Sequence, residues 1–116
     1  MNEALYKATD ELSVFVNRAK ELNESAQSLL EGLVKEDTDF LSSVDIHLPI
    51  MAERYKEACS MKEDYDDFTI KYKTLIDDMG GDIVKVKIDT GIGMDTLIKI
   101  IGSTLRKLIE IKRSYE

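Results

Sequence analysis

A repeat of small and aliphatic residues runs through the first third of the chain and constrains its fold more than any other feature. Its members alternate in steps of three and four residues over about four heptads, which aligns them along one face of an α-helix. They are Leu5, Ala8, Leu12, Phe15, Ala19, Leu22, Ala26, Leu29 and Leu33. Because alanine allows another helix to approach closely, we expect an antiparallel hairpin with a second helix of the same chain. Exchange of this helix between subunits is the alternative.

A second apolar stripe predicts the partner helix, between about residues 45 and 79. Its members are Leu48, Met51, Tyr55, Ala58, Tyr65, Thr69, Tyr72, Ile76 and Met79. Pro49 lacks an N–H group and clashes with the preceding turn, so we expect the helix to begin just before it, near residues 45–48. The stretch 34–44 is then a connection, and the expected hairpin comprises residues 3–34 and 45–79. Gly80 and Gly81 are typical of a helix end.

A third long helix is predicted at residues 94–115. Asp95 suits its first turn, and Lys112 and Arg113 suit its last turn, where they complement the helix dipole. Gly102 within it indicates either a bend in the helix or close approach of a neighbouring backbone, and we favour close approach. The helix is apolar around so much of its circumference that it needs more than one neighbour, within one subunit or between subunits. The candidate residues for an oligomer interface are Leu97, Ile101, Leu105, Leu108 and Ile111.

The segment between the second and third helices changes period. Val84, Val86 and Ile88 alternate with charged residues, a pattern that is typical of a half-buried strand, and we predict a short β segment at residues 83–90. A single strand leaves its own backbone groups unpaired, so it would pair with a return strand near Gly91 or with another subunit. The expected fold is mainly α, and residues 1–116 form one helical domain.

The charge is divided unevenly along the chain. Residues 82–116 contain seven basic and five acidic residues, whereas residues 1–81 contain nine basic and eighteen acidic ones. The two parts therefore carry +2 and −9, and the whole chain carries −7. An overall acidic charge argues against indiscriminate binding to nucleic acid. The single cysteine, the lack of a secretory signal and the lack of a bilayer-spanning run predict a cytoplasmic protein with no membrane association.

The sequence contains no recognisable catalytic, metal or cofactor motif, and we expect a protein that is not an enzyme. His47 is the only histidine, so it has no second histidine with which to form a metal site. Cys59 lies within a helical stripe and has no nearby histidine to activate it. The acidic block at residues 63–67 is typical of a solvated helix face and lacks the pattern of a calcium loop.

The order of elements resembles that of the small terminase subunits of tailed phages, in particular the P27-like family. The resemblance covers roughly residues 36–112 and rests on the helix start DIHLPIMAERYKEA at residues 45–58, the glycine-led segment at residues 81–90 and the final amphipathic helix. The chain departs from the family in reading Gly-Asp-Ile-Val at residues 81–84. The resemblance implies a non-catalytic homo-oligomer that recognises viral double-stranded DNA for the large terminase subunit, in the cytoplasm of the host cell.

If the resemblance holds, basic residues in the last part of the chain are the candidates for contacts with phosphate groups. They are Lys85, Lys87, Lys99, Arg106, Lys107, Lys112 and Arg113. The competing hypothesis is a small acidic helical adaptor or inhibitor that binds a basic protein surface and makes no contact with DNA. The strong acidity of residues 1–81 suits such a partner.

Overall fold

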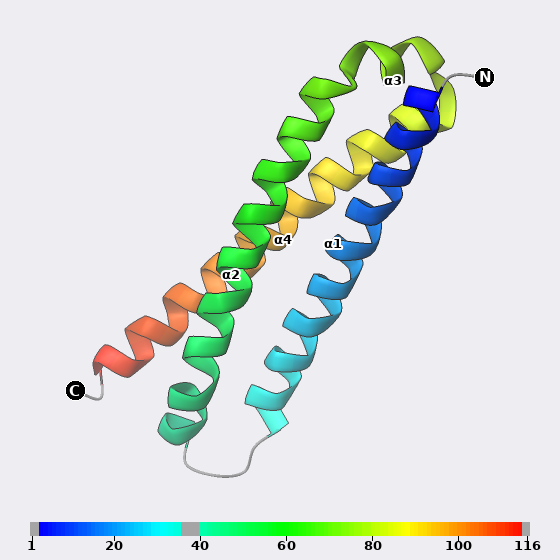
Figure 1. Cartoon of the computed structure of the whole chain (residues 1–116). Coiled ribbons are helices and arrows are strands. Elements are labelled where there is room, and N and C mark those ends of the chain that lie inside the picture. Colours follow the sequence, from blue (N-terminus) through cyan, green and yellow to red (C-terminus); the bar gives the residue numbers. More distant parts are fainter. Residues whose placement is uncertain (1–2, 36–39, 115–116) are drawn as a thin grey trace.

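The computed structural model describes residues 3–35 and 40–114, which are helical almost throughout (Figure 1). The helices are α1 (Glu3–Lys35), α2 (Phe40–Lys71), α3 (Lys73–Met79) and α4 (Gly81–Ser114). The predicted mainly α fold is therefore confirmed. Of the predicted connection between the first two helices, residues 36–39 lie outside the described part of the chain, and the residues on either side of them are helical.

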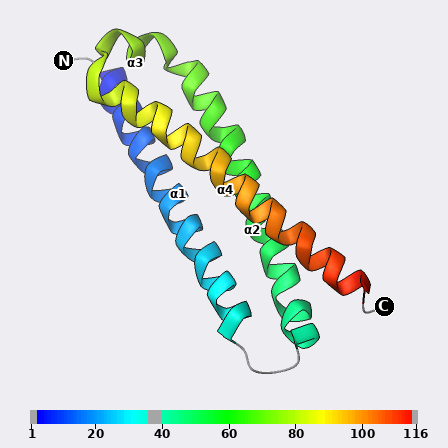
Figure 2. The same ribbon diagram turned by 180° about the vertical axis from the view of Figure 1, so that it is seen from behind.

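The three long helices form an elongated bundle of 60 × 21 × 19 Å. The chain runs along the bundle in α1, returns in α2, turns across one end in α3 and runs back in α4 (Figures 1 and 2). Helix α4 lies beside α1 at the end that carries α3, but both views show its C-terminal end separated from α1. At that end Lys112 of α4 is 3.3 Å from Asp45 of α2, so α4 stays attached to α2.

Small residues allow α1 and α2 to pack closely, as expected for a hairpin within one chain. Ala8 and Ala26 of α1 and Ala58 of α2 are almost completely buried. Between the helices of the bundle, methionine side chains fill the space that remains, and their flexibility suits irregular gaps. The largest fully buried side chains are Val44, Met51, Met61, Ile76, Met94 and Ile101.

Helix α2 begins at Phe40, so our prediction of a start near residues 45–48 is wrong. Pro49 lies inside the helix, where its ring removes one backbone hydrogen bond. Both Pro49 and Asp45, whose carbonyl would have accepted that bond, lie on the exposed side of α2. Water can therefore hydrate the carbonyl, and the helix continues through the proline.

The predicted β segment at residues 83–90 is also wrong, because these residues form the first turns of α4. The described chain contains no strand with which this segment could pair, whereas a helix satisfies its own backbone groups. The half-buried positions have helical spacing and are Ile83, Val84, Lys87 and Thr90, whereas Val86 and Ile88 point away from the core. The final helix therefore begins at Gly81 rather than at residue 94.

Gly102 of α4 is a site of close approach, as the sequence indicated, but its neighbour is a side chain. A Cβ atom at this position would lie 3.1 Å from Cε2 of the Tyr55 ring. Glycine thus allows the ring of Tyr55, on α2, to lie directly against the backbone of α4. The backbone of a neighbouring helix, which we expected there, is not the closest group.

The junctions on either side of α3 differ in kind. At Tyr72 the backbone departs from helical angles, but i→i−4 hydrogen bonds continue from Tyr72 to Phe68 and from Ile76 to Tyr72. This junction is therefore a bend in a nearly continuous helix. The other junction is a true break, since Gly80 and Gly81 have φ values of 62° and 64°, which L-residues with side chains rarely adopt. This break reverses the chain into α4.

Candidate interaction surfaces

A groove between α1 and α2 combines an apolar floor with an acidic rim; we call it the acidic groove. It has a volume of about 360 Å³ and is lined by Glu11, Val14, Phe15, Asp64, Asp67, Phe68 and Lys71. Most of its surface is apolar, and Val14 is 55% exposed within it. Three carboxylates against one lysine leave the rim negative. Heptad spacing on α1 and the acidic block of α2 bring these residues together, because the two helices are antiparallel neighbours.

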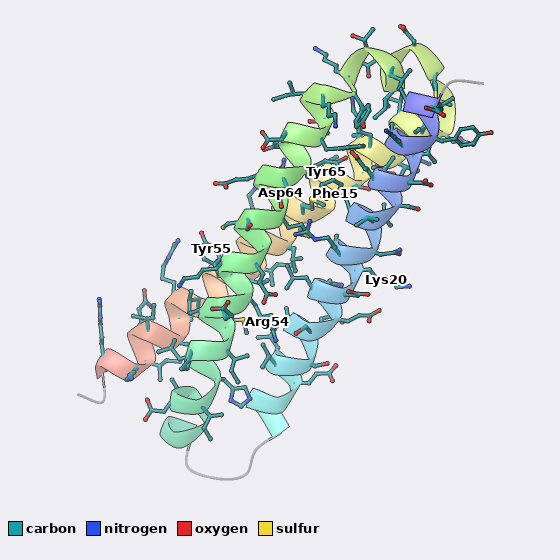
Figure 3. All side chains as sticks on the ribbon, in the orientation of Figure 1. Phe15, Lys20, Arg54, Tyr55, Asp64 and Tyr65 are labelled. Carbon is teal, nitrogen blue, oxygen red and sulfur yellow. The ribbon has the colours of Figure 1, made fainter. Side chains whose placement is uncertain are left out.

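Aromatic rings beneath the acidic groove hold its floor in place. Phe15 packs edge-on against Tyr65 and in a tilted arrangement against Phe68, with ring centroids 5.3 Å apart in both pairs. In Figure 3 Phe15 and Tyr65 lie between α1 and α2. The Tyr65 hydroxyl donates a hydrogen bond to the carbonyl of Lys87, which connects this cluster to α4. The floor is therefore packed on aromatic rings from α1 and α2 and is connected to α4.

The carboxylates of the acidic groove differ in how far they are already neutralised. Asp64 lies 3.7 Å from Arg18, which also lies over the Phe15 ring. Within the described residues, Glu11 and Asp67 have no ion-pair partner. These two groups are the ones that an incoming cation would meet without displacing a basic residue of the chain.

Two of the seven predicted phosphate contacts are engaged within the chain. Lys87 is 3.1 Å from Asp77 of α3, and Lys112 is paired with Asp45. The other five residues are exposed: Lys85, Lys99, Arg106, Lys107 and Arg113. Four of these lie along one side of α4, because they are spaced by fourteen, seven and seven residues: Lys85, Lys99, Arg106 and Arg113. Lys107 lies on another side. The structure thus assembles part of the predicted basic set.

The five predicted interface residues of α4 face the core of their own chain. Leu97, Ile101 and Leu108 are buried, with exposed fractions of 5%, 1% and 3%, and Leu105 and Ile111 pack against the core while partly exposed. The apolar stripe is therefore accounted for by contacts within one subunit, which was the other interpretation of the sequence. The structure leaves different apolar residues exposed on α4, among them Ile88, Ile92 and Ile100.

Two groups in the contact between α2 and α4 have shifted pKa values. The Asp66 carboxylate, which accepts a 2.7 Å hydrogen bond, raises the pKa of Lys62, and burial partly opposes this effect. Asp95 of α4, 3.7 Å away, raises it further. Burial and the nearby Asp66 charge raise the pKa of Tyr65 to about 12. Both shifts follow from the packing and ion pairs of this contact.

In the described part of the chain, no three side chains of the types His, Cys, Asp and Glu are arranged so that they could hold a metal ion. The described helices also contain no apolar stretch long enough to cross a bilayer.

The sequence alone did not reveal the acidic groove. Val14 was recognisable as an apolar residue beside the heptad stripe, and Asp64 and Asp67 as part of a solvated charge run. Only the pairing of α1 with α2 shows that these residues share one groove. Comparison of the chain with models of protein families, with curated proteins and with solved structures finds no match.

Proposed function

We propose that this chain is a non-catalytic binding module that recognises a basic segment of a partner protein in the acidic groove. The observation that carries the proposal is the exposed Val14 floor with unpaired carboxylates, Glu11 and Asp67, at its rim. An apolar side chain of the partner would lie on this floor, and flanking lysine or arginine residues would meet the carboxylates. This is the adaptor function that the acidity of residues 1–81 first suggested.

The physical roles of floor and rim differ. Burial of apolar surface at Val14 and at the edges of Phe15 and Phe68 supplies affinity, at roughly 25 cal/mol for each Å² removed from water. The carboxylates act at longer range, and they accelerate association with a basic partner more than they tighten the complex. Binding should therefore weaken only in part at high salt, because salt screens the rim but not the floor.

The test uses a short fluorescein-labelled peptide that has leucines one helical turn apart among lysines and arginines. We expect Val14→Glu to weaken its binding at least tenfold in fluorescence anisotropy, because the new charge would be buried beneath the leucine. Asp67→Asn should weaken binding less and should reduce its dependence on salt. The matched control is Glu24→Gln, which removes a carboxylate from an exposed position of α1 outside the acidic groove.

Two results would contradict this proposal. One is equal binding of a peptide in which serine replaces both leucines, since the apolar floor would then contribute nothing. The other is an equal loss of affinity in Asp67→Asn and Glu24→Gln, since binding would then follow overall charge rather than the groove.

A second candidate function, recognition of double-stranded DNA as in small terminase subunits, is favoured by the exposed basic line on α4. Lys85, Lys99, Arg106 and Arg113 could neutralise phosphates along one side of the helix. The internal pairing of Lys87 and Lys112 reduces the charge available for such binding. We therefore rank it below the acidic groove.

Charge reversal on α4 tests this second candidate. If DNA binds, Arg106→Glu should weaken binding at least tenfold and lower the slope of affinity against salt concentration. Lys107→Glu is the matched control, because it changes the net charge equally on another side of the helix. Fluorescence anisotropy with labelled duplex DNA at several salt concentrations measures both. Equal effects of the two substitutions, or no binding by the unmodified chain, would count against DNA recognition.

A further inference from the structure

We propose that the acidic groove is the middle section of a longer furrow between α1 and α2, and that the furrow holds one amphipathic helix of the partner protein. This inference rests on the proposed function and adds the length and charge pattern of the partner segment. Helix α4 lies behind α1 and α2 in Figure 1 and in front of them in Figure 2. The opposite side of the α1–α2 pair, which carries the furrow, is not covered by α4, and no residue of α4 lines the furrow.

The furrow consists of three grooves that follow one another along the seam. The acidic groove shares Glu11 and Lys71 with a groove of about 840 Å³ toward the N-terminal end of α1. On its other side lies a groove of about 570 Å³, whose α1 residues begin at Arg18. The α1 side chains that line the three grooves lie on one face of the helix, because they are spaced by three and four positions. Among them are Lys7, Glu11, Val14, Arg18, Glu21 and Ser25.

The dimensions of the furrow fit a helix. Glu3 and Ser25 lie at its two ends and are 22 positions apart, which corresponds to about 33 Å along α1. A groove between two helices is a surface into which an amphipathic helix lays its apolar side. Val14 is the exposed large hydrophobic residue of the furrow and lies eleven positions from each end. The apolar anchor of the partner helix therefore lies near its centre.

Charge distinguishes the two halves of the furrow on either side of the Arg18–Asp64 ion pair. Five carboxylates and two lysines line the half that begins at Glu3. Three carboxylates and three basic residues line the half that ends at Ser25: Glu21, Glu53, Glu57, Arg18, Arg54 and Lys56. The first half therefore attracts basic side chains, whereas the second half has no net charge.

Interactions within the chain already engage Arg54 in the neutral half. Its Nε donates a 2.8 Å hydrogen bond to Oγ of Ser25, and its Nη1 donates a 2.9 Å hydrogen bond to Glu57. Figure 3 shows Arg54 between α1 and α2. An acidic partner would have to compete with Glu57 for this guanidinium, so uncharged polar side chains suit this half better. The occupant is thus a helix that is basic over one half, apolar at its centre and uncharged over the other half.

Fluorescence anisotropy with two labelled peptides of about 22 residues tests this pattern. In the first peptide an alanine–glutamine segment precedes two leucines one helical turn apart, and lysines follow them. The control peptide has the same composition, but its alanine–glutamine segment follows the lysines and would extend beyond the Glu3 end of the furrow. We expect the control to bind at least fivefold more weakly. Equal affinities would overturn the furrow and leave the acidic groove as the binding site, whereas no binding of either peptide would contradict the proposed function itself.

A cross-link locates the two ends of the first peptide independently. In a Cys59→Ser background, Lys7→Cys should form a disulfide on oxidation with a cysteine near the lysine end of the peptide. Thr9→Cys, which is exposed on the opposite side of α1, and Ser60→Cys, in the neutral half, should not. A cysteine near the other end of the peptide should react with Ser60→Cys instead. Equal reaction at Lys7→Cys and Thr9→Cys, or reaction of either peptide end at both ends of the furrow, would overturn the proposal. Circular dichroism should show that all variants are folded.

Discussion

Replacement of Ile101 by alanine is expected to lower the free energy of unfolding by about 2–5 kcal/mol. Ile101 is 1% exposed and lies in α4 among core residues from the other helices. The substitution removes buried apolar surface and leaves a cavity that the surrounding helices can fill only in part. Urea unfolding followed by circular dichroism measures the loss.

Ile100 provides a control that differs in burial alone. It is the preceding residue of α4, is 47% exposed, and undergoes the same change in helix propensity when alanine replaces it. We expect Ile100→Ala to change the free energy of unfolding by less than about 1 kcal/mol in dilute solution. If Ile101 instead belonged to an oligomer interface, the loss in Ile101→Ala would depend on protein concentration. A loss that is the same at all concentrations would assign it to the core.

Raising the pH from about 10 to 12 is expected to destabilise the folded chain through Tyr65. Its pKa is about 12 in the folded state against an ordinary value of 10.0. Below pH 10 the phenol keeps its proton in both states, so the stabilising contribution is fully present. Between pH 10 and 12 only the unfolded state releases the proton, and stability falls by up to about 1.4 kcal/mol for each pH unit.

Tyr65→Phe isolates this effect, because phenylalanine keeps the ring contacts and cannot ionise. We expect the variant to lose about 1 kcal/mol near neutral pH, where the hydroxyl hydrogen bond to the Lys87 carbonyl is removed. Its stability should then fall less steeply in the alkaline range. A residual slope in the same direction is expected from Lys62, whose pKa is also raised by folding. Parallel slopes in the two proteins would contradict the assignment to Tyr65.

The sequence predicted the pairing of α1 with α2 because burial there follows a single period. Ala8, Leu12, Phe15 and Ala26 are all buried, and each belongs to the predicted stripe. The prediction failed at residues 83–90, where two patterns overlap. Val84, Val86 and Ile88 alternate as in a strand, whereas Ile83, Val84 and Lys87 have the spacing of one helix face. The described fold contains no strand with which this segment could pair.

The candidate surfaces were harder to predict than the helices, because each depends on residues from two elements or on the exposure of a single side chain. Ile92 and Leu97 are both apolar residues of one helix, yet one is 59% exposed and the other 5%. The two residues are five apart and therefore point about 140° apart around α4. The packing of α4 against α1 and α2 shows which of the two directions is covered.

The break at Gly80 and Gly81 has a consequence for the handedness of the chain. Both residues adopt positive φ values, and a Cβ atom added to either would meet no atom within 4 Å. Glycine is therefore required at these positions by the backbone angles and not by crowding from neighbouring atoms. An L-residue at either position would oppose these angles, whereas its mirror image, a D-alanine, would adopt positive φ readily. At the turn into α4, a D-residue would thus fit the backbone better than the L-residues that the ribosome incorporates.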